Sequence, residues 1–483
     1  MPMDLRQNKT SSSSHPASRE LGELDTPSFN EAFAASSVSI ETSDAANDRS
    51  TAYTISAGDT FHGRLSFLGD TDFVRISLTA GSAYTINLMG SGVAPIQDTF
   101  LGLYDANGNY VASNDDNGSS LNSTLTFTAT TSGTYYIEAD SFSQSEVGGY
   151  TITVSAPVAP KPVFSMTQIA DYLRIGFWQD NGLTPIQYAI HASGILDVDI
   201  SGLTASAQNL ALWALDAWTT VTGITFNTGP ANGGVEIVFD DLHAGADTTH
   251  MISGGYIIRS DINISQQWIA DYGTNFDSYS YQTFMHEIGH ALGLGHAGNY
   301  NGFGLFGQDN LYLNDSWQAT VMSYFDQIDN TFIDASFAYL ATPMIADIIA
   351  IQGIYGAASG LRSSDTTYGD NSTAGGAYDR LSQLMSSGQL TNGMAITIVD
   401  GGGFDTLDLR SNASAQRIDL APGAISDVNG MIGNLIVAVG TFVERALTGA
   451  GNDMVSGNGV GNYLGSGDGA DTLYGDAGFD TLD

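Results

Sequence analysis

The chain has 483 residues with 14 Lys or Arg against 52 Asp or Glu, which gives a formal net charge of −38. The absence of cysteine excludes disulfide bonds, thiolate metal ligands and a thiol nucleophile. So much negative charge argues against binding to nucleic acid or anionic membranes, and divalent cations are suitable counter-ions for it.

Residues 1–49 are rich in serine and acidic residues and lack the apolar core of a secretory signal peptide. We expect a disordered leader, and an autoprocessed propeptide is one interpretation of it. No apolar run anywhere in the sequence is long enough to predict a membrane span.

Residues 50–156 show the alternation of polar and apolar side chains that is typical of a β-sandwich. Strands are expected at 73–78, 84–88, 125–129, 135–139 and 150–154. Gly69–Phe73 and Gly133–Ile137 make this segment resemble the bacterial pre-peptidase C-terminal (PPC) domain, which implies an accessory module of secreted peptidases. Its turn acids are candidates for a calcium site, or else simply solvated: Asp70, Asp72, Asp98, Asp115 and Asp116.

Residues 157–163 form a proline-rich linker, beyond which the periodicity changes. Apolar residues from Leu210 to Val221 recur at helical spacing, and Gly223 ends this helix. Helices alternate with strands over 164–356, which indicates an α+β or α/β domain.

The most informative motif lies in this domain and runs from His286 to His296. On a helix, His286 and His290 are one turn apart and point at one ion, while Glu287 reaches a water molecule on that ion. Gly293 allows a positive-φ turn that brings back His296 as a third ligand. Three neutral imidazoles leave one coordination position open, as expected of a catalytic zinc ion.

This longer motif is the metzincin signature, and the surrounding residues resemble the serralysin family of secreted bacterial metalloproteases. The resemblance covers 281–296, 298–301 and the helix expected at 343–356. It implies a metzincin zinc-peptidase fold with Met322 as the structural Met-turn residue. It also implies that Tyr324 is a fifth zinc ligand that becomes an oxyanion donor. Substrate is expected along a sheet edge, for which 254–258 is the candidate strand.

Beyond residue 356, Gly and Asp dominate and a nine-residue repeat emerges. Asp453, Asn462, Asp471 and Asp480 are spaced by nine, each followed two residues later by Val or Leu. This spacing predicts an RTX-like parallel β-roll over 357–483, in which turns two repeats apart share calcium ions. Asp453 should then pair with Asp471, and Asn462 with Asp480 at a weaker site. The expected calcium ligands of the array are Gly449, Gly451, Asp453, Gly467, Gly469, Asp471 and Asp480.

An isolated turn of the same kind lies earlier, at 400–405. The serralysin resemblance implies that it faces the loop 362–366 and encloses a further calcium ion. The ligand candidates carried over are Arg362, Ser364, Thr366, Asp400, Gly402 and Asp405.

The sequence therefore predicts a multidomain protein with an N-terminal β-sandwich, an α+β metzincin zinc-peptidase domain and a C-terminal parallel β-roll. We expect a secreted, monomeric zinc metalloendopeptidase with one catalytic Zn²⁺ and several structural Ca²⁺ ions, acting on protein or peptide substrates. A non-catalytic, calcium-dependent surface or adhesion protein with a relic peptidase domain is one alternative, and a zinc hydrolase of other substrates is another. The roll stops inside a repeat, so either the chain is a fragment or its export differs from the family's type I-like route.

Overall fold

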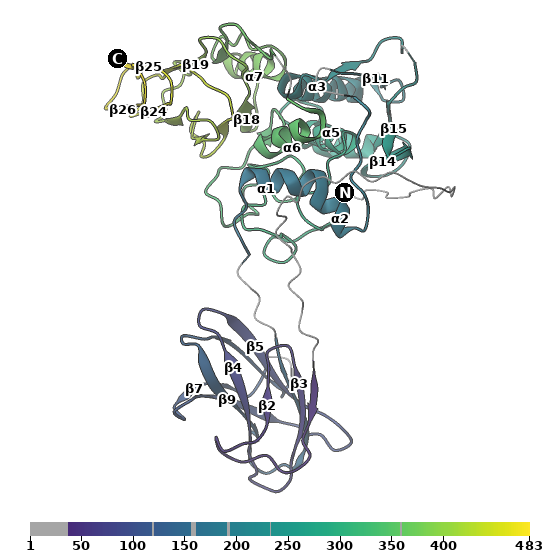
Figure 1. The fold of residues 1–483 in the computed structure, drawn as a ribbon, viewed down its shortest axis with the longest axis vertical. Coiled ribbons are helices and arrows are strands. Elements are labelled where there is room, and N and C mark those ends of the chain that lie inside the picture. Colours follow the sequence, from purple (N-terminus) through teal and green to yellow (C-terminus); the bar gives the residue numbers. More distant parts are fainter. Residues whose placement is uncertain (1–36, 118–119, 156–160, 191–193, 232, 358–359) are drawn as a thin grey trace, which may run out of the picture. The chain divides into compact units, whose positions relative to one another are not determined.

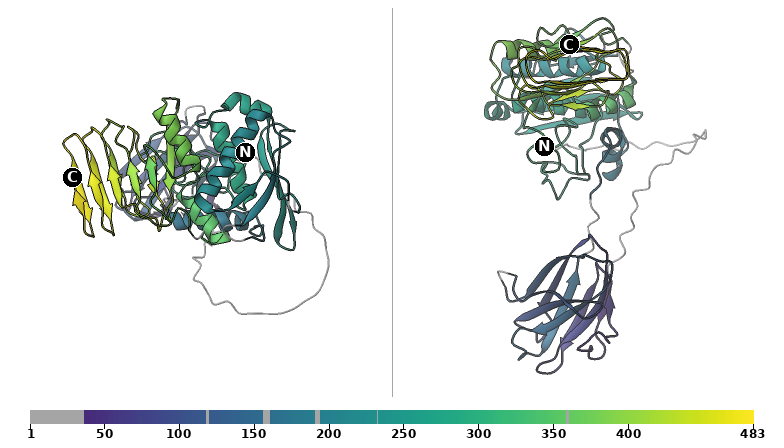
Figure 2. Two further views of the ribbon diagram at one scale, coloured as in Figure 1. Left: turned by 90° about the horizontal axis from the view of Figure 1, so that it is seen from above. Right: turned by 90° about the vertical axis from the view of Figure 1, so that its left-hand side faces the viewer.

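The computed structural model describes residues 37–117, 120–155, 161–190, 194–231, 233–357 and 360–483. These fall into two compact units, divided between residues 160 and 161 (Figures 1 and 2). No helix within these ranges is long and apolar enough to cross a bilayer.

The first unit consists of two five-stranded sheets that share one apolar core, to which both contribute buried side chains such as Ile86 and Leu103. In sheet order, the first contains β1 (Val38–Ile40), β3 (Thr60–Leu65), β10 (Gly148–Val154), β5 (Ala83–Gly90) and β8 (Ser123–Thr128). The second contains β2 (Thr54–Ile55), β4 (Asp72–Leu78), β9 (Gly133–Ser141), β6 (Thr99–Asp105) and β7 (Tyr110–Asn114). All five strands expected from alternation are present.

The prediction of a disordered leader is wrong for residues 37–49. Strand β1 pairs in parallel with β3, and Ala45 is buried. The local composition gave no sign of this, because β1 is held by a partner strand that lies 22 positions further along the chain. Residues 1–36 lie outside the described residues.

The second unit begins with a five-stranded sheet in which only the last strand is antiparallel. In sheet order it contains β12 (Thr225–Asn227), β11 (Ile195–Asp199), β13 (Ile237–Asp240), β15 (Tyr256–Ile264) and β14 (Ala246–Ser253). Strand β14 therefore stands at an edge of this sheet.

Helices of this unit pack around the sheet and one large apolar core. They are α1 (Met166–Asp171), the π-helical turn η1 (Tyr172–Gly176), α2 (Phe177–Asp180), α3 (Ala205–Thr222), α4 (Gln266–Tyr272), α5 (Tyr279–Ala291), α6 (Ile345–Tyr355) and α7 (Gly376–Ser386). The expected end of α3 is confirmed, since Gly223 caps it with φ +75°. Helix α5 contacts both α3 and β14, so the edge strand lies beside it.

The chain then continues into a roll of short parallel strands, seen as successive yellow rungs in Figure 2. One sheet contains β17 (Thr367–Gly369), β19 (Thr406–Asp408), β23 (Arg445–Leu447), β25 (Tyr463–Gly465) and β27 (Thr481–Leu482). The other contains β20 (Arg417–Asp419), β24 (Met454–Asn458) and β26 (Thr472–Asp476). From β23 on, strands start every nine residues and alternate between the sheets, so neighbours in a sheet are two repeats apart.

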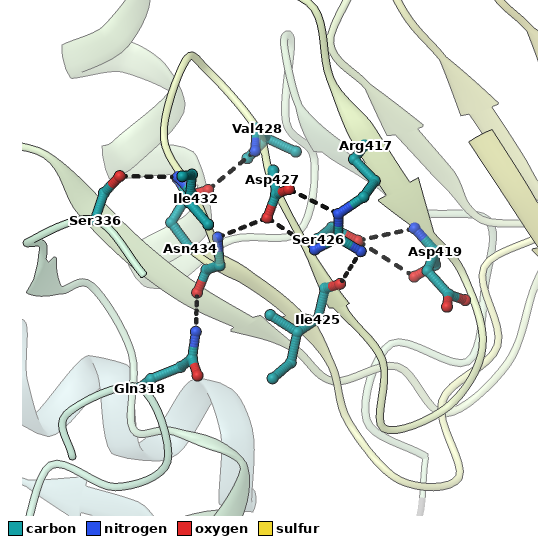
Figure 3. Close-up of polar contacts among 11 residues, drawn as sticks. Gln318, Ser336, Arg417, Asp419, Ile425, Ser426, Asp427, Val428, Ile432 and Asn434 are labelled. Carbon is teal, nitrogen blue, oxygen red and sulfur yellow. Dashed lines mark hydrogen bonds and ion pairs between the residues drawn. The ribbon is translucent and has the colours of Figure 1, made fainter. Parts of the chain in front are cut away.

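A small third sheet joins the roll to the helices. It contains β16 (Tyr339–Leu340), β18 (Met394–Ile398), β22 (Leu435–Val437) and β21 (Ile425–Ser426). Figure 3 shows the polar contacts beside it. The Gln318 amide donates to the Gly433 carbonyl at 3.0 Å, and Ser336 Oγ accepts the Ile432 N–H at 2.9 Å.

Candidate metal centre

Helix α5 and the turn that follows it bring three histidines together. Nitrogen atoms of His286, His290 and His296 lie within 4.8 Å of one another, and all three side chains are buried. His290 Nε2 and His296 Nε2 are 3.0 Å apart. Ser278 caps the start of this helix, since its side chain accepts the Tyr281 N–H.

Backbone carbonyls orient two of these imidazoles. The Nδ1 atoms of His286 and His290 lie 2.8 Å from the carbonyl oxygens of Val321 and Leu294. With Nδ1–H donating there, Nε2 carries the lone pair and faces the cluster. In the described part of the chain, His286 Nε2 is buried without a hydrogen-bond partner.

Asp347 on α6 holds the segment that carries Val321. Its Oδ2 atom accepts the N–H groups of Val321 and Met344, each at 2.8 Å, and Thr320 donates to Oδ1. Burial raises the pKa of Asp347 to about 7. This carboxyl group therefore fixes the backbone oxygen that orients His286.

Two glycines make the close approaches of this centre possible. Gly293 adopts φ +99°, as the motif predicted, and a Cβ atom there would lie 2.3 Å from the Ile186 carbonyl oxygen. A Cβ atom on Gly289 would lie 2.5 Å from the sulfur of Met322. Met322 thus packs directly against the helix that carries the histidines.

Glu287 is buried beside the triad, and only one of its carboxyl oxygens has a partner. Thr248 Oγ1 donates to Glu287 Oε2 at 2.8 Å, while Oε1 is without a partner among the described residues. Burial raises the pKa of Glu287 to about 8.

The histidines are held in the neutral form that metal ions bind. Burial lowers the pKa of His290 to about 4 and lowers the pKa of His286 and His296 well below the ordinary value. Three neutral, converging imidazoles with an orphaned buried nitrogen form a donor set that fits a zinc ion. The residues present therefore fit the metal that the motif predicts.

Tyr324 lies against this centre. Its ring centroid is 4.6 Å from that of His296 and 4.7 Å from that of Tyr300, and its phenol oxygen accepts the Gly302 N–H at 3.1 Å. Burial raises the pKa of Tyr324, so the phenol keeps its proton. The structure thus places Tyr324 at the histidines.

The expected substrate edge at 254–258 is wrong. Gly254 and Gly255 form the turn between β14 and β15. Tyr256 and Ile257 pair with β14 on one side, while Ile257 bridges Tyr188 on the other. Strand β14 is the edge strand instead. Sequence alternation identifies a strand but gives no information on which strand lies at the edge.

The loop 362–366 and the turn 400–405 do meet. Asp405 Oδ1 accepts the Thr366 N–H at 2.7 Å, and a Cβ atom on Gly403 would lie 2.7 Å from the backbone of Ser364. Asp405 Oδ2 is buried without a partner among the described residues, and burial together with the charge of Asp400 raises the pKa of Asp405 to about 7. Asp400 Oδ1 accepts the Gly402 N–H.

The Arg362 side chain points elsewhere. Its guanidinium donates to the carbonyl oxygens of Val399 and Thr220 and to the Tyr368 hydroxyl. A guanidinium has no acceptor for a cation, so Arg362 could serve as the expected calcium ligand only through its backbone carbonyl. Its contacts tie the junction loop to α3.

Within the roll, the expected partners are adjacent. Asp471 Oδ1 accepts the Asp453 N–H at 2.8 Å, and Asp480 Oδ1 accepts the Asn462 N–H at 2.9 Å. Asp453 Oδ2 is buried without a partner in the described chain. The glycines stack in the same register, since Cβ atoms on Gly467 and Gly469 would meet the carbonyl oxygens of Gly449 and Gly451. Carbonyl and carboxylate oxygens of turns two repeats apart therefore lie together.

The acidic residues expected to form one calcium site in the sandwich do not all lie together. Carboxylate oxygens of Glu41, Asp44 and Asp72 lie within 4.8 Å of one another. Asp72 is fully buried, with Oδ2 accepting the Tyr150 hydroxyl at 2.7 Å and Oδ1 without a partner among the described residues. Asp98, Asp115 and Asp116 are not members of this cluster.

Several of these residues escaped sequence reasoning. Thr248, Glu41 and Asp44 lie in no motif, Asp347 lies in the helix expected at 343–356 without a role predicted for it, and each meets its partner only through the tertiary fold. Thr248, for example, is 39 positions from Glu287. Alternation along β14 would have predicted that Thr248 faces inward, but not which group it contacts.

Two segments of the chain match models of known protein families. Residues 357–478 match "Peptidase M10 serralysin C terminal", and residues 70–141 match "Bacterial pre-peptidase C-terminal domain".

Curated relatives are similar over longer stretches. The chain is 32% identical over 356 residues to the "Metallopeptidase AprA" of Pseudomonas marginalis, which covers 68% of this chain and 72% of that protein. It is 34% identical over 332 residues to the "Metalloprotease AprA" of Pseudomonas entomophila, with coverage of 64% and 67%. It is 37% identical over 259 residues to "Serralysin B" of Dickeya chrysanthemi, which covers 50% of this chain and 51% of that protein.

Proposed function

Since this chain belongs to the serralysin family of metalloproteases, we propose that it is a zinc-dependent endopeptidase whose general base is Glu287. Membership of the family makes the chain a metalloendopeptidase. The observation that supports zinc is the convergence of three imidazoles, with nitrogen atoms within 4.8 Å of one another, beside a buried carboxyl group. His286, His290 and His296 would hold the ion, with Tyr324 as a further ligand in the resting state.

A bound zinc ion supplies Lewis acidity, which lowers the pKa of a water molecule and polarises the scissile carbonyl. Glu287 Oε1 takes the proton of the attacking water and passes it to the leaving amine. Thr248 keeps Oε2 occupied meanwhile. The Tyr324 hydroxyl donates a hydrogen bond to the oxyanion as negative charge develops there.

The protein substrate would lie extended along β14. This strand ends the sheet among the described residues and packs beside α5, so a peptide added there as a further strand passes next to Glu287. Recognition by main-chain hydrogen bonds tolerates many side chains, which suits a protease of broad specificity.

Structural calcium ions would bind in three regions, namely the roll, the junction loop and the sandwich. Asp453 and Asp471 with the carbonyls of Gly449, Gly451, Gly467 and Gly469 offer one site in the roll, and Asp480 beside Asn462 offers a weaker one. The Arg362 carbonyl with Ser364, Thr366, Asp400, Gly402 and Asp405 would offer the junction site. In the sandwich, Asp72 with Glu41 and Asp44 replaces the acidic set expected from the sequence. Each region has hard oxygen donors, and buried carboxylate oxygens without a partner in the described chain occur at Asp72, Asp405 and Asp453.

We further propose a secreted, monomeric protein, as the family resemblance and the acidic composition suggest. The residues of the site favour a peptidase over the alternative of an adhesion protein with a relic peptidase domain. A relic is free to lose its base or a metal ligand, and this chain keeps Glu287 and all three histidines.

The test is metal analysis coupled to proteolysis. Purified protein should contain one zinc per chain and digest casein in the presence of calcium. A zinc-selective chelator should remove metal and activity in proportion, and added zinc should restore both. Full activity of a demonstrably zinc-free sample would contradict the proposal.

A further inference from the structure

Thr248 is the point at which the edge strand touches the general base. It lies in β14 and is fully buried. Its hydroxyl is 2.8 Å from Glu287 Oε2 and 3.1 Å from the Glu287 carbonyl oxygen. Within the described ranges, no other side chain forms a hydrogen bond with either carboxyl oxygen of Glu287.

This contact sets which carboxyl oxygen is free. A carboxylate on a freely turning side chain presents either oxygen, whereas a hydrogen bond to Oε2 leaves Oε1 as the oxygen that receives a proton. The alignment of a general base within hydrogen-bond reach of its proton is a requirement for its action. A displacement of about 1 Å is enough to lower a rate by about 100-fold.

The position of Thr248 also connects this contact to the substrate. Strand β14 pairs with β15 on one side, and in the described part of the chain it has no strand on the other. A peptide that adds to the free side would hold the β14 backbone, and with it the Thr248 hydroxyl, more firmly in the position that it has here. Docking and alignment of the base then depend on the same strand.

We propose that Thr248 is a positioning residue for Glu287 and that it couples docking of an extended peptide on β14 to alignment of the carboxyl group. This inference rests on the proposed zinc-peptidase function. If Thr248 had a purely structural role, removal of its hydroxyl would lower stability, and its effect on kcat would not depend on substrate length. The two roles are therefore separable by experiment.

The experiment compares Thr248→Val, which keeps the shape but removes the hydroxyl, with Thr248→Ser, which keeps the hydroxyl. Thr222→Val is the matched control, because the Thr222 hydroxyl is also buried and bonded, to the Trp218 carbonyl on α3. Thr248→Ala is the second hydroxyl-free variant should the valine side chain prevent folding. Zinc content, kcat and KM are measured with short and extended peptides.

We expect Thr248→Val to lower kcat by about 100-fold with zinc content unchanged, and Thr248→Ser to stay within about fivefold of wild type. Wild-type kcat should rise as the peptide is extended along the strand, and this rise should vanish in Thr248→Val. Crystal structures of zinc-free wild type and Thr248→Val should show one Glu287 carboxyl orientation in the former and more than one in the latter.

A Thr248→Val enzyme with wild-type kcat, an equal loss in Thr248→Ser or Thr222→Val, or an unchanged Glu287 orientation would overturn the inference. These outcomes differ from failure of the proposed function. In that case the zinc-loaded wild type itself would lack peptidase activity, or Glu287→Gln would retain it.

Discussion

A Cβ atom on Gly293 would lie 2.3 Å from the carbonyl oxygen of Ile186, and Gly293 itself has φ +99°. The turn after α5 therefore depends on the absence of a side chain for two separate reasons. One reason is backbone strain, and the other is contact with a neighbouring backbone that cannot rotate away.

Gly293→Ala should consequently lose both stability and zinc. We expect a cost of about 3 kcal/mol or more, because the strain of about 1–2 kcal/mol is joined by displacement of the turn that delivers His296. Gly356→Ala is the matched control, since Gly356 has φ +87° but open space around its Cβ position. Thermal melts and zinc analysis of both variants check the expectation, and equal melting temperatures would contradict it.

Glu287→Gln should retain zinc and lose peptidase activity by about 1000-fold or more. The amide keeps the size of the carboxyl group and an oxygen that still accepts from Thr248, but it does not act as a base. Zinc content and casein hydrolysis provide the measurements. A variant that loses its zinc would instead place Glu287 among the ligands.

Tyr324→Phe should lower kcat by about 10- to 100-fold with little change in zinc content. The ring continues to pack on His296 and Tyr300, while the oxyanion loses its donor. Steady-state kinetics with one peptide substrate are sufficient. An unchanged kcat would reduce Tyr324 to a packing role.

Calcium removal should unfold the C-terminal strands, because clustered carboxylates repel one another when no cation is bound. Asp471→Ala should raise the calcium concentration at the folding midpoint by about tenfold, and more than Asp480→Ala does. Each of these aspartates accepts the backbone N–H of the residue two repeats earlier, but for Asp471 that residue is Asp453, which adds a carboxylate, and for Asp480 it is Asn462, which adds no charge. Circular dichroism during calcium titration follows this transition. Identical midpoints in the two variants would argue against a stronger first site.

Stability around β4 should fall as pH rises when calcium is absent. Burial and the charges of Glu41, Asp70 and Asp44 raise the pKa of Asp72 to about 8. A carboxyl group whose pKa is raised on folding contributes stability that is fully present below its unfolded pKa and is lost as pH rises through the folded value. The affected window therefore runs from about pH 4 to pH 8.

Hydrogen exchange of peptides from β4 in the full chain, with chelator present, should accelerate across this window beyond the intrinsic chemical rate. Added calcium should suppress the change, because the cation favours the ionised carboxylate. Asp72→Asn supplies the comparison, since it does not titrate. The same pH dependence in that variant would assign the effect to other groups.

Local patterns in the sequence determined much of this protein. The spacing of His286, Glu287, His290 and His296 places them on one helix and its exit turn, and the nine-residue repeat sets the register of the roll. Such features depend on neighbours a few residues apart, or on an exact repeat, so periodicity alone encodes them.

Only the tertiary structure decided which side chains contact the residues of those motifs. Thr248 reaches Glu287 across 39 positions, Asp347 reaches Val321 across 26, and Glu41 lies beside Asp72 although they belong to segments far apart in the sequence. The edge position of β14 and the order in residues 37–49 are of the same kind. A buried polar group takes whichever partner packing brings within hydrogen-bond distance, and packing is a property of the whole chain, so no local pattern in the sequence records it.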